Sequence, residues 1–513
     1  MKAVLKIFLF SIMLAIGLQV QAQVHRSKIE YLDLYYQKAM ENWNVPGMAI
    51  ALVTKDSLLF AKGYGVIDIY TQQPVDAHTL FAVASNTKAF TSTALAMLVD
   101  QGKISWDDKV VKYLPYFELY DSYVSNTMTI RDLLTHRSGL KTFAGDLIWY
   151  GSNYSRKEII SKAKYLKPTY GFREQFGYSN IMYLTAGEII PVVTGQSWDE
   201  FVYENILQPL GMNRSTLHVK ELINRDNVAQ PHTYVNGKLK AIPWLDWDNI
   251  GPAGSLISSA NEMGTWLQMN LQKGIFNNDS LLSSARIFEM QSAQTINNVS
   301  MSSVKRFPST HFKAYGLGWS LMDYMGYKIV SHNGGYDGMI SQTLFIPEKN
   351  IGFVILTNSL SSLYYPLMYQ TLDVLLGNPV EKDWSKEILE LMKKGEEMTK
   401  KHLEELSASR VKNTKPSLDL PEYSGIYSCD LYDSVKVFEE KGKFYAQFMQ
   451  SPDFIGEMKH WHYDTFTIDF QALPSLPQGF VTFKLNRAGK VDSMEIFVDN
   501  PDFDFTEFDF KKK

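Results

Sequence analysis

The sequence predicts an α+β fold in which helices flank an antiparallel sheet, followed by a small all-β domain. Three observations lead to this prediction. The chain has 513 residues, more than one hydrophobic core usually covers. Helical and strand-like patterns alternate irregularly from about residue 24 to residue 376. Beyond about residue 417 the pattern changes to short alternating strands. We therefore expect two domains.

The first domain is expected over residues 23–376 and contains the predicted sheet. Its last three strands are close in sequence and separated by turn residues, which indicates an antiparallel meander. Helices lie between the first strand and these three, an order typical of α+β folds rather than of doubly wound parallel sheets. The predicted strands are residues 48–53, 328–330, 342–346 and 352–357, and the predicted helices are residues 85–101, 129–134, 181–193, 197–207 and 260–271.

A helical linker over residues 377–416 leads to a β-rich domain over residues 417–513. Residues 383–409 are rich in Glu and Lys and carry apolar residues at helical spacing, which predicts an exposed amphipathic helix. Turns at Glu440-Lys-Gly442 and Arg487-Ala-Gly489 are expected to join neighbouring strands as hairpins. The strands predicted for this domain are residues 434–438, 443–448, 465–468, 480–485 and 493–498.

The N-terminus has the three parts of a secretory signal peptide. Lys2 and Lys6 supply the positive charge, residues 7–18 form the apolar core, and Val20-Gln-Ala22 is a small-residue cleavage site. We expect residues 1–22 to be removed and the mature protein to be periplasmic or secreted. No other stretch is long and apolar enough to span a bilayer, so no integral membrane span is expected after signal removal.

Composition narrows the function further. Hydrophobic residues make up 45% of the chain and charged residues 21%, as in ordinary globular proteins. The net charge of −4 and the lack of a basic stripe argue against a nucleic-acid partner. Cys429 is the sole cysteine, so neither an internal disulfide nor a cysteine-based catalytic or zinc site is expected. The sequence does not specify an oligomeric state.

Ser85 and Lys88 are the first candidate catalytic pair. Ser85 stands where the apolar stretch of residues 80–84 meets a predicted helix, so its hydroxyl lies at a helix N-terminus that favours negative charge. Residues three apart are neighbours on a helix face, which brings the lysine to the serine. A lysine accepts the serine proton only when it is neutral, and burial lowers its pKa from the reference value of about 10.4.

Tyr178 is the candidate for sharing or relaying that proton. It stands in Tyr178-Ser-Asn180, on a predicted loop before a helix, where functional side chains are usually displayed. Two further tyrosines have the same Tyr-x-Asn spacing. Tyr203 lies within a predicted amphipathic helix and Tyr234 precedes a glycine turn, so we expect both to be structural.

The third element is Ser331-His332-Asn333-Gly334-Gly335, on the first strand of the predicted meander. His332 begins the only His-x-Gly sequence in the chain and is expected to line the site. The two glycines allow the backbone of a substrate to approach closely. Backbone N–H groups of Ser85 and Gly335 would form an oxyanion hole suited to acyl transfer, in which one donor contributes a factor of about 10²–10³ to kcat.

Seven motifs occur in an order that resembles one family. They are Phe81-Ala-Val-Ala-Ser-Asn-Thr-Lys88, Thr129-Ile-Arg-Asp-Leu-Leu-Thr-His-Arg-Ser-Gly139, Tyr178-Ser-Asn180, Gln208-Pro-Leu-Gly-Met212, Gly251-Pro-Ala-Gly-Ser-Leu-Ile-Ser-Ser259, Tyr315-Gly-Leu-Gly-Trp319 and His332-Asn-Gly334. Together they resemble the serine β-lactamase and penicillin-binding-protein superfamily, in its class C, D-alanyl-D-alanine carboxypeptidase and esterase branch. The resemblance covers about residues 30–375.

This resemblance implies roles for four of the residues. Ser85 would be the acylated nucleophile, Lys88 and Tyr178 the proton shuttle, and Asn180 a group that positions the substrate amide or ester. It also implies a β-lactamase-like fold, with an antiparallel sheet flanked by helices and a helical subdomain. The β-rich tail resembles the small lipocalin-like domain found behind some members.

One departure from the family pattern concerns the substrate. True β-lactamases and many carboxypeptidases have Lys-Thr-Gly where this chain has His332-Asn-Gly334. The charged lysine helps to hold a substrate carboxylate, whereas a histidine is mostly neutral near pH 7. We therefore expect weak or no β-lactamase activity.

The sequence thus predicts an exported serine hydrolase that forms a covalent acyl-enzyme, of the esterase or the D-amino-acid peptidase or amidase type. Its substrate would be a small ester, amide or peptide, and no metal or organic cofactor is expected. Two alternatives remain. An acyltransferase would pass the acyl group from Ser85 to an alcohol or amine such as a sterol or a small metabolite. An inactive protein of the same fold would serve as a binding or sensor protein.

Several aromatic and histidine residues fit two interpretations. Trp149, Tyr150, Trp244 and Trp247 flank predicted loops and suit either the wall of an apolar acyl site or the core. His136 is expected to organise a turn. His460 and His462 alternate as on a strand and could share a face, but no further metal ligand accompanies them, so we expect two exposed histidines.

Overall fold

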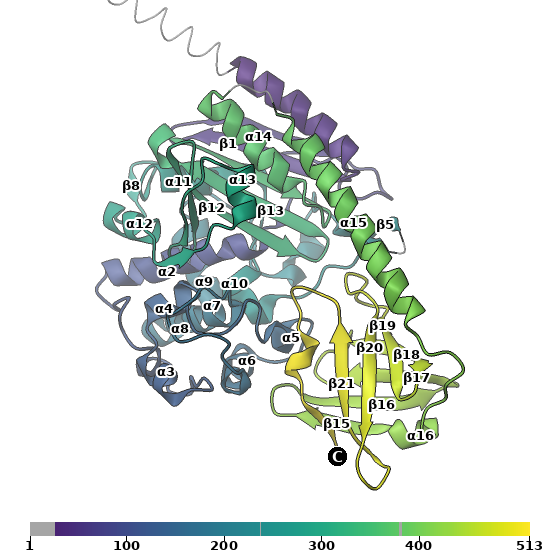
Figure 1. Ribbon diagram of the computed structural model, residues 1–513. Helices are drawn as coiled ribbons and strands as arrows, with labels where there is room; N and C mark the ends of the chain where they lie inside the picture. The colour runs from purple at the N-terminus through teal and green to yellow at the C-terminus, as the bar shows by residue number, and fades with distance from the viewer. Residues whose placement is uncertain (1–25, 236, 379–381) are drawn as a thin grey trace, which may run out of the picture.

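The computed structural model describes residues 26–235, 237–378 and 382–513, and the predicted signal peptide lies outside them. Figure 1 shows two units: a layered unit of helices around a sheet, and a β-barrel at the C-terminal end of the chain. Helix α15 (Trp384–Ala408) runs from the first unit to the second. No helix among the described residues is long and apolar enough to cross a membrane.

The first unit is built on an eight-stranded antiparallel sheet. Its strands lie in the order β2-β1-β14-β13-β12-β11-β10-β9. The predicted meander is confirmed, because β12 pairs with β13 and β13 pairs with β14, which returns along β1. The strands are β1 (Gly47–Thr54), β2 (Leu58–Gly65), β9 (Thr295–Asn297), β10 (Lys313–Tyr315), β11 (Ser320–Tyr324), β12 (Tyr327–Tyr336), β13 (Met339–Ile346) and β14 (Ile351–Thr357).

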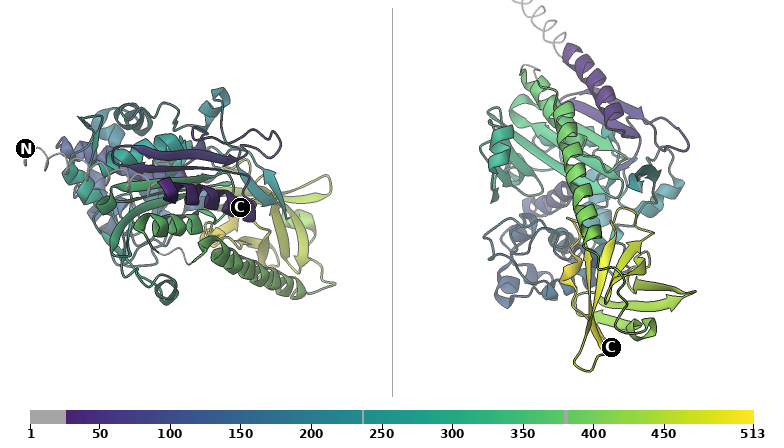
Figure 2. Two further views of the ribbon diagram at one scale, coloured as in Figure 1. Left: turned by 90° about the horizontal axis from the view of Figure 1, so that it is seen from above. Right: turned by 45° about the vertical axis from the view of Figure 1, so that its right-hand side comes forward.

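Helices cover both faces of this sheet, which explains why the sequence of β1 is apolar throughout. Met48, Ile50 and Leu52 face a core shared with the helix of residues 26–42 and with α14 (Tyr364–Leu376). The alternate residues of β1 face the opposite core, where α11 (Ala260–Leu271) packs on β1 and β14. Side chains of a strand alternate between the two faces, so a strand buried on both sides reads as a continuous apolar run. Figures 1 and 2 show the helices on either side of the sheet.

Most of the predicted helices form, with two breaks. The helix expected over residues 181–193 divides into α7 (Asn180–Gly187) and α8 (Ile189–Thr194). Pro191 explains the break, since its ring clashes with the carbonyl four residues earlier and it has no N–H to donate. The helix expected over residues 197–207 continues from α9 (Trp198–Val202) into a π-helical turn, η4 (Tyr203–Leu207).

The remaining helices and short strands lie outside the eight-stranded sheet. The helices are α2 (Thr87–Asp100), α3 (Ser122–Thr127), α4 (Ile130–Leu134), α5 (Asp146–Trp149), α6 (Arg156–Lys162), α10 (Gly251–Gly254), α12 (Ser284–Met290) and α13 (Met301–Arg306). Three two-stranded sheets pair β3 (Phe81–Ala82) with β6 (Ile257–Ser258), β4 (His232–Val235) with β5 (Lys238–Ala241), and β7 (Ile275–Phe276) with β8 (Asp279–Ser280).

The C-terminal domain is a closed antiparallel barrel of eight strands. Its strands are β15 (Gly425–Cys429), β16 (Asp433–Glu440), β17 (Lys443–Phe448), β18 (Ile455–His462), β19 (Thr465–Phe470), β20 (Gly479–Leu485), β21 (Val491–Val498) and β22 (Phe510–Lys512), and a short helix α16 (Leu420–Tyr423) precedes them. The predicted hairpins β16–β17 and β20–β21 both form. Buried aromatic side chains such as Phe448, Phe470 and Phe505 pack inside it, as expected for a barrel of this size.

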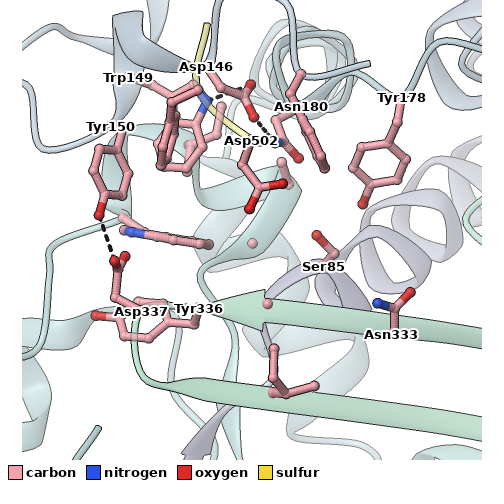
Figure 3. A pocket seen from close by; sticks show the side chains of 18 of the residues that line it. Ser85, Asp146, Trp149, Tyr150, Tyr178, Asn180, Asn333, Tyr336, Asp337 and Asp502 are labelled. Atoms are coloured by element: carbon pink, nitrogen blue, oxygen red, sulfur yellow. Dashed lines mark hydrogen bonds between the residues drawn. The ribbon is translucent and has the colours of Figure 1, made fainter. Parts of the chain in front are cut away.

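The barrel packs on the loop that leads into α5. Lys141 forms ion pairs with Asp504 and Glu507 of the barrel. The backbone N–H of Gly145 donates to the Glu507 carboxylate at 2.9 Å. The ring centre of Phe503 lies 4.3 Å from that of Tyr150, so the interface combines apolar and charged contacts. The two domains therefore meet at Tyr150, one of the residues labelled in Figure 3.

Candidate active site

Ser85 is presented by a strained turn between a strand and a helix. It lies in the 3₁₀ turn η1 (Ala84–Asn86), between β3 and α2. Ala84, the residue before it, has a φ of 46°. Left-handed backbone is unfavourable for an alanine and is found where the surrounding structure enforces it, often at functional sites. The turn leaves the Ser85 side chain at the wall of a cavity.

Lys88 lies on the first turn of α2 and is held by three hydrogen bonds. Its Nζ is 3.0 Å from Ser85 Oγ, 2.7 Å from Asn180 Oδ1 and 2.8 Å from the carbonyl oxygen of Ala253. The lysine side chain is fully buried, at 0% exposure. The structure therefore brings together the predicted pair, and a residue from the start of α7 joins it.

Burial sets the ionisation of Lys88. Desolvation lowers its pKa from 10.5 to about 7, and the negative charge of Asp146 only partly offsets this effect. A lysine with such a pKa is neutral in a substantial fraction of molecules near pH 7, so it can accept a proton. The residue type, the position and the pKa all suit a general base.

Asp146 is a site residue that the sequence analysis missed. Its carboxylate accepts a 2.6 Å hydrogen bond from Asn180 Nδ2 and a 2.9 Å hydrogen bond from Trp149 Nε1. Desolvation raises its pKa from 3.8 to about 7. Asn180 thus points its amide nitrogen at an acid and its oxygen at Lys88. Asp146 lies in none of the motifs, and the only signal in the sequence was its position three residues before Trp149.

Tyr178 lies over Lys88, and its hydroxyl points toward Ser85 in Figure 3. The Lys88 Nζ is 4.7 Å from the centre of the tyrosine ring. Burial raises the pKa of Tyr178 well above 10, although hydrogen bonding with Ser85 counteracts part of this rise. The tyrosine is consequently a protonated phenol at neutral pH and is able to donate a proton.

His136 holds the Tyr178 loop in place, which extends the structural role predicted for it. The His136 ring lies 4.2 Å from the Tyr178 ring, centre to centre. Its Nδ1 accepts a 3.0 Å hydrogen bond from the backbone N–H of Ser179, and its carbonyl oxygen accepts another from Gly177. Burial lowers the pKa of His136 well below 6.5, so the ring is neutral.

His332 lines the cavity as a neutral, fixed ring. It is 3% exposed, and burial together with the charge of Lys88 lowers its pKa to about 3. Its Nδ1 is 2.6 Å from the carbonyl oxygen of Asn333, which requires the proton to be on Nδ1. Nε2 therefore accepts from the Tyr315 hydroxyl at 2.9 Å. Both ring nitrogens are occupied, so His332 supplies no positive charge to a substrate.

Gly334 and Gly335 lie on β12 beside Ser85, beyond the last residue pair between β11 and β12 at Ser320 and Ser331. A Cβ on Gly334 would lie 2.3 Å from the carbonyl oxygen of Val83 and 2.9 Å from the Ser85 nitrogen, so only glycine fits there. A Cβ on Gly335 would meet nothing closer than 3.7 Å. The close approach at Gly334 is what places this end of β12 against the serine.

A cavity of about 580 Å³, part of which Figure 3 shows, is lined by Ser85, Asp146, Tyr178, Asn180, His332 and Gly335. Trp149, Tyr150 and Trp247 line it, whereas Trp244 lines a neighbouring pocket. The barrel contributes to the wall as well. The lining residues from the barrel are Ser475, Asn500, Asp502 and Phe503. Among the described lining residues there is no lysine or arginine.

The two barrel histidines are arranged differently from the expectation. A β-bulge separates His460 from His462 on β18. His460 Nε2 lies 3.0 Å from the carbonyl oxygen of Tyr463, and His462 Nδ1 accepts from the backbone N–H of Val411. Both rings are partly buried rather than exposed. Across the described ranges, no group of three His, Cys, Asp or Glu side chains is placed to hold a metal ion.

Family models match both domains. A model described as "Beta-lactamase" matches residues 32–370, and a model described as a domain of unknown function (DUF3471) matches residues 409–512. The first match covers the whole sheet and every site residue of the first domain described above. The second covers all eight strands of the barrel.

Two named proteins and one solved structure are similar over most of this chain. Unguisins hydrolase ungD of Aspergillus violaceofuscus is 27% identical over 443 residues, which are 80% of this chain and 76% of that protein. Protein flp of Staphylococcus aureus strain MW2 is 25% identical and covers 68% of this chain and 66% of its own length. The octameric penicillin-binding protein homologue from Pyrococcus abyssi superposes with a TM-score of 0.62 at 22% identity, over 94% of this chain and 100% of that chain.

Proposed function

Since the chain belongs to the beta-lactamase family, we propose that it is an exported serine hydrolase acting through a covalent acyl-enzyme on Ser85. Within the superfamily we assign it to the class C, carboxypeptidase and esterase branch. The observation that carries the proposal is the pair of Ser85 and Lys88. A fully buried amine with a pKa of about 7 lies 3.0 Å from the serine hydroxyl, which is the arrangement that activates a serine nucleophile.

The reaction follows from the positions of the proton donors and acceptors. Neutral Lys88 takes the proton from Ser85 as its oxygen bonds to the substrate carbonyl carbon. The negative charge that forms on the carbonyl oxygen is stabilised by the backbone N–H groups of Ser85 and Gly335. The carbon–oxygen or carbon–nitrogen bond to the leaving group then breaks, and the leaving group takes a proton from Tyr178, which Lys88 reprotonates. Water then attacks the carbonyl carbon of the acyl-enzyme and gives up a proton to the base. The bond to Ser85 breaks, which releases the acid and restores the serine hydroxyl.

The walls of the cavity argue for substrates without a carboxylate near the scissile bond. Penicillins carry such a carboxylate, and neither the neutral His332 nor any other described lining residue offers it a positive charge. We therefore propose esters, or amides and peptides of D-amino acids, as substrates, with weak or no β-lactamase activity. The name of the similar ungD protein, a hydrolase, favours water over an alcohol as the acceptor.

The barrel is proposed to be a lipocalin-like domain that closes one side of the active site. An eight-stranded closed antiparallel barrel is the architecture of lipocalins. Aromatic side chains fill its interior, so its role here is the contact of its loops with the cavity rather than carriage of a ligand. Residues 1–22 would direct the chain out of the cytoplasm.

The test is the mass of the intact protein after exposure to a fluorophosphonate and, separately, to an activated acyl ester. One adduct on the wild-type protein and none on Ser85→Ala supports the acyl-enzyme. A folded protein that gains no adduct would favour the binding or sensor alternative. Product analysis with an added alcohol then separates hydrolysis from transfer, because an ester product that rises with alcohol concentration indicates an acyltransferase.

A further inference from the structure

A second pocket, here called the distal pocket, adjoins the catalytic cavity. It has a volume of about 420 Å³ and shares two lining residues, Asp337 and Ser475, with the cavity around Ser85. Its other walls come from both domains. The first domain contributes residues 240–245, at the end of β5 and in the loop that follows, and the barrel contributes residues 471–475, between β19 and β20. The distal pocket therefore lies where the two domains meet, beside the catalytic cavity.

A row of aromatic rings joins the two spaces. The ring centres of Trp149 and Trp247 are 5.0 Å apart, and those of Trp247 and Tyr336 are 4.7 Å apart. The row continues to Trp244, whose ring centre is 5.2 Å from that of Tyr336. The first three rings line the catalytic cavity and Trp244 lines the distal pocket. The Tyr336 hydroxyl donates to the carbonyl oxygen of Leu245 at 2.6 Å, which fixes the loop that carries both tryptophans of residues 244–247. An apolar chain can follow this aromatic wall from one space into the other.

The distal pocket is apolar inside and polar at its rim. Lys240 and Asp453 are exposed to solvent. The one buried carboxylate in its wall, Asp337, already accepts hydrogen bonds from the hydroxyls of Tyr150 and Ser475. Both domains supply apolar side chains to the wall, among them Pro243, Trp244, Leu245, Leu473 and Pro474. A concave site of this composition binds apolar groups.

Strand β12 shows which end of the substrate meets the distal pocket. Gly335, whose N–H is proposed to bind the oxyanion, stands two residues before Asp337, a span of roughly 7 Å in extended backbone. In the other direction along β12, the His332 ring lies 6.3 Å from the Tyr178 ring, centre to centre. Figure 3 shows Tyr178 and Asp337 on opposite sides of Ser85. Since Tyr178 is proposed to protonate the leaving group, the acyl part extends the other way, toward Asp337 and the distal pocket.

We propose that the distal pocket binds an apolar group of the acyl part, carried roughly 7–10 Å from the scissile carbonyl carbon, so that the enzyme selects extended acyl groups with an aromatic or aliphatic end. In a peptide this group is the side chain of the second or third residue before the scissile bond, because one extended residue spans about 3.3–3.6 Å. This inference rests on the proposed function and adds the substrate class to it. Trp244 is then a specificity-determining residue that touches the substrate and not the reacting atoms.

The experiment compares three p-nitrophenyl esters: 6-phenylhexanoate, hexanoate and phenylacetate. The first carries its ring six bonds from the carbonyl carbon, which is roughly 7 Å in an extended chain. Hexanoate has the same chain without the ring, and phenylacetate has the same ring close to the carbonyl. The wild-type protein is expected to have a kcat/KM for 6-phenylhexanoate about 10-fold to 100-fold above that for either of the others, the range for burying one aromatic group.

Two variants assign this preference to the distal pocket. Ala472→Trp fills the pocket from an exposed position of its wall, and Trp244→Ala removes the aromatic ring. Each should lower the ratio of kcat/KM for 6-phenylhexanoate to that for hexanoate by about 5-fold or more. The matched control is Trp461→Ala, a half-buried tryptophan of β18 that lines neither space, and it should leave the ratio unchanged. If Trp244→Ala does not fold, Ala472→Trp decides.

Two results would overturn the inference: an unchanged ratio in Ala472→Trp, or a wild-type protein with equal kcat/KM for 6-phenylhexanoate and hexanoate. If none of the esters is cleaved, the rate of fluorophosphonate labelling gives the answer. Slower labelling with 6-phenylhexanamide than with hexanamide, in the wild type but not in Ala472→Trp, supports the inference, and equal rates contradict it. A protein that labels at Ser85 without this preference disproves the role of the distal pocket alone, whereas a protein that does not label disproves the proposed function.

Discussion

Lys88 Nζ lies 2.7 Å from Asn180 Oδ1, although the two residues are 92 positions apart in the chain. The amide nitrogen of Asn180 donates to Asp146, so the Asn180 side chain bridges a buried base and a buried acid. Burial moves the pKa of the lysine down and that of the acid up, in both cases to about 7. The two groups consequently titrate in the same pH range, and their charges are linked.

The first prediction concerns pH. Only the neutral form of Lys88 accepts the proton of Ser85, and its pKa is about 7. We expect kcat/KM for a neutral ester to rise with pH through about 7 and to level off above pH 8. The measurement is the pH profile of the wild-type protein between pH 5 and pH 9. A profile that is flat from pH 6 to pH 8 would contradict the assignment of Lys88 as the base.

The second prediction concerns Asp146→Asn. The negative charge of Asp146 raises the pKa of Lys88, so its removal should move the rising limb of the kcat/KM profile to lower pH. The asparagine is the same size as the aspartate, but its single oxygen can accept from either Asn180 or Trp149 and not from both, because these two donors bond to different carboxylate oxygens. Asp337→Asn is the control, because that carboxylate lines the cavity without a contact to Asn180. An unchanged midpoint in Asp146→Asn would disprove the coupling.

The third prediction concerns the stability of the same variant. The folded protein raises the pKa of Asp146 from 3.8 to about 7, so between these values the unfolded chain binds fewer protons at this site than the folded chain does. The contribution of Asp146 to stability is present below pH 4 and is lost as the pH rises to about 7. The stability of Asp146→Asn relative to the wild type should therefore be greater at pH 8 than at pH 4, by about 1–3 kcal/mol. Urea unfolding at pH 4 and pH 8 measures this, and an equal difference at both values would refute it.

The fourth prediction compares two adjacent glycines. In Gly334→Ala the new Cβ would lie 2.3 Å from the Val83 carbonyl oxygen, a backbone atom that cannot turn aside. Separating β12 from the Ser85 turn should destabilise the fold by about 1–3 kcal/mol and reduce kcat by more than about 10²-fold. Gly335→Ala keeps the N–H group and meets only Ile340 at 3.7 Å, so it should cost much less. Thermal unfolding and ester kinetics of both variants provide the test, which fails if the two are alike.

The fifth prediction separates proton donation from nucleophile activation. The phenol of Tyr178 has a pKa well above 10 and is proposed to protonate the leaving group. A p-nitrophenolate ion leaves without a proton, whereas an amine does not. Tyr178→Phe should therefore lose about 10²–10⁴-fold on an anilide or amide and much less on a p-nitrophenyl ester. Lys88→Ala should impair both substrates, and a Tyr178→Phe loss of the same size on ester and amide would argue for a role in activating Ser85.

The sequence predicted most of the helices and strands whose apolar residues recur at a regular spacing. The meander of β12, β13 and β14 was evident because its strands are apolar and close in sequence. It did not predict β2 (Leu58–Gly65), the edge strand, whose half-exposed residues include Lys62 and two glycines. The short strands β9, β10 and β22 also carried no period, since three residues are too few to show one.

The candidate site shows the same division. Ser85, Lys88, Tyr178, Asn180, His332 and the two glycines of β12 lie in short motifs whose local spacing already suggests their chemistry. The structure places Ser85, Tyr178, Asn180, His332 and Gly335 in the wall of one cavity, and Lys88 and Gly334 against Ser85. Asp146 and Asp502 have no such motif. They line the cavity because α5 and the loop after β21 approach the serine from opposite domains.

The sequence by itself predicted the helix and strand periods, a mixed part followed by an all-β part, and the candidate serine, lysine and tyrosine. These features depend on residues near one another in the chain. Only the tertiary structure decided the ionisation of Lys88, Asp146 and His332, the place of Asp502 in the cavity wall, and the cavity between the domains. Desolvation and charge interactions depend on every group within several ångströms, and here those groups come from segments tens to hundreds of residues apart.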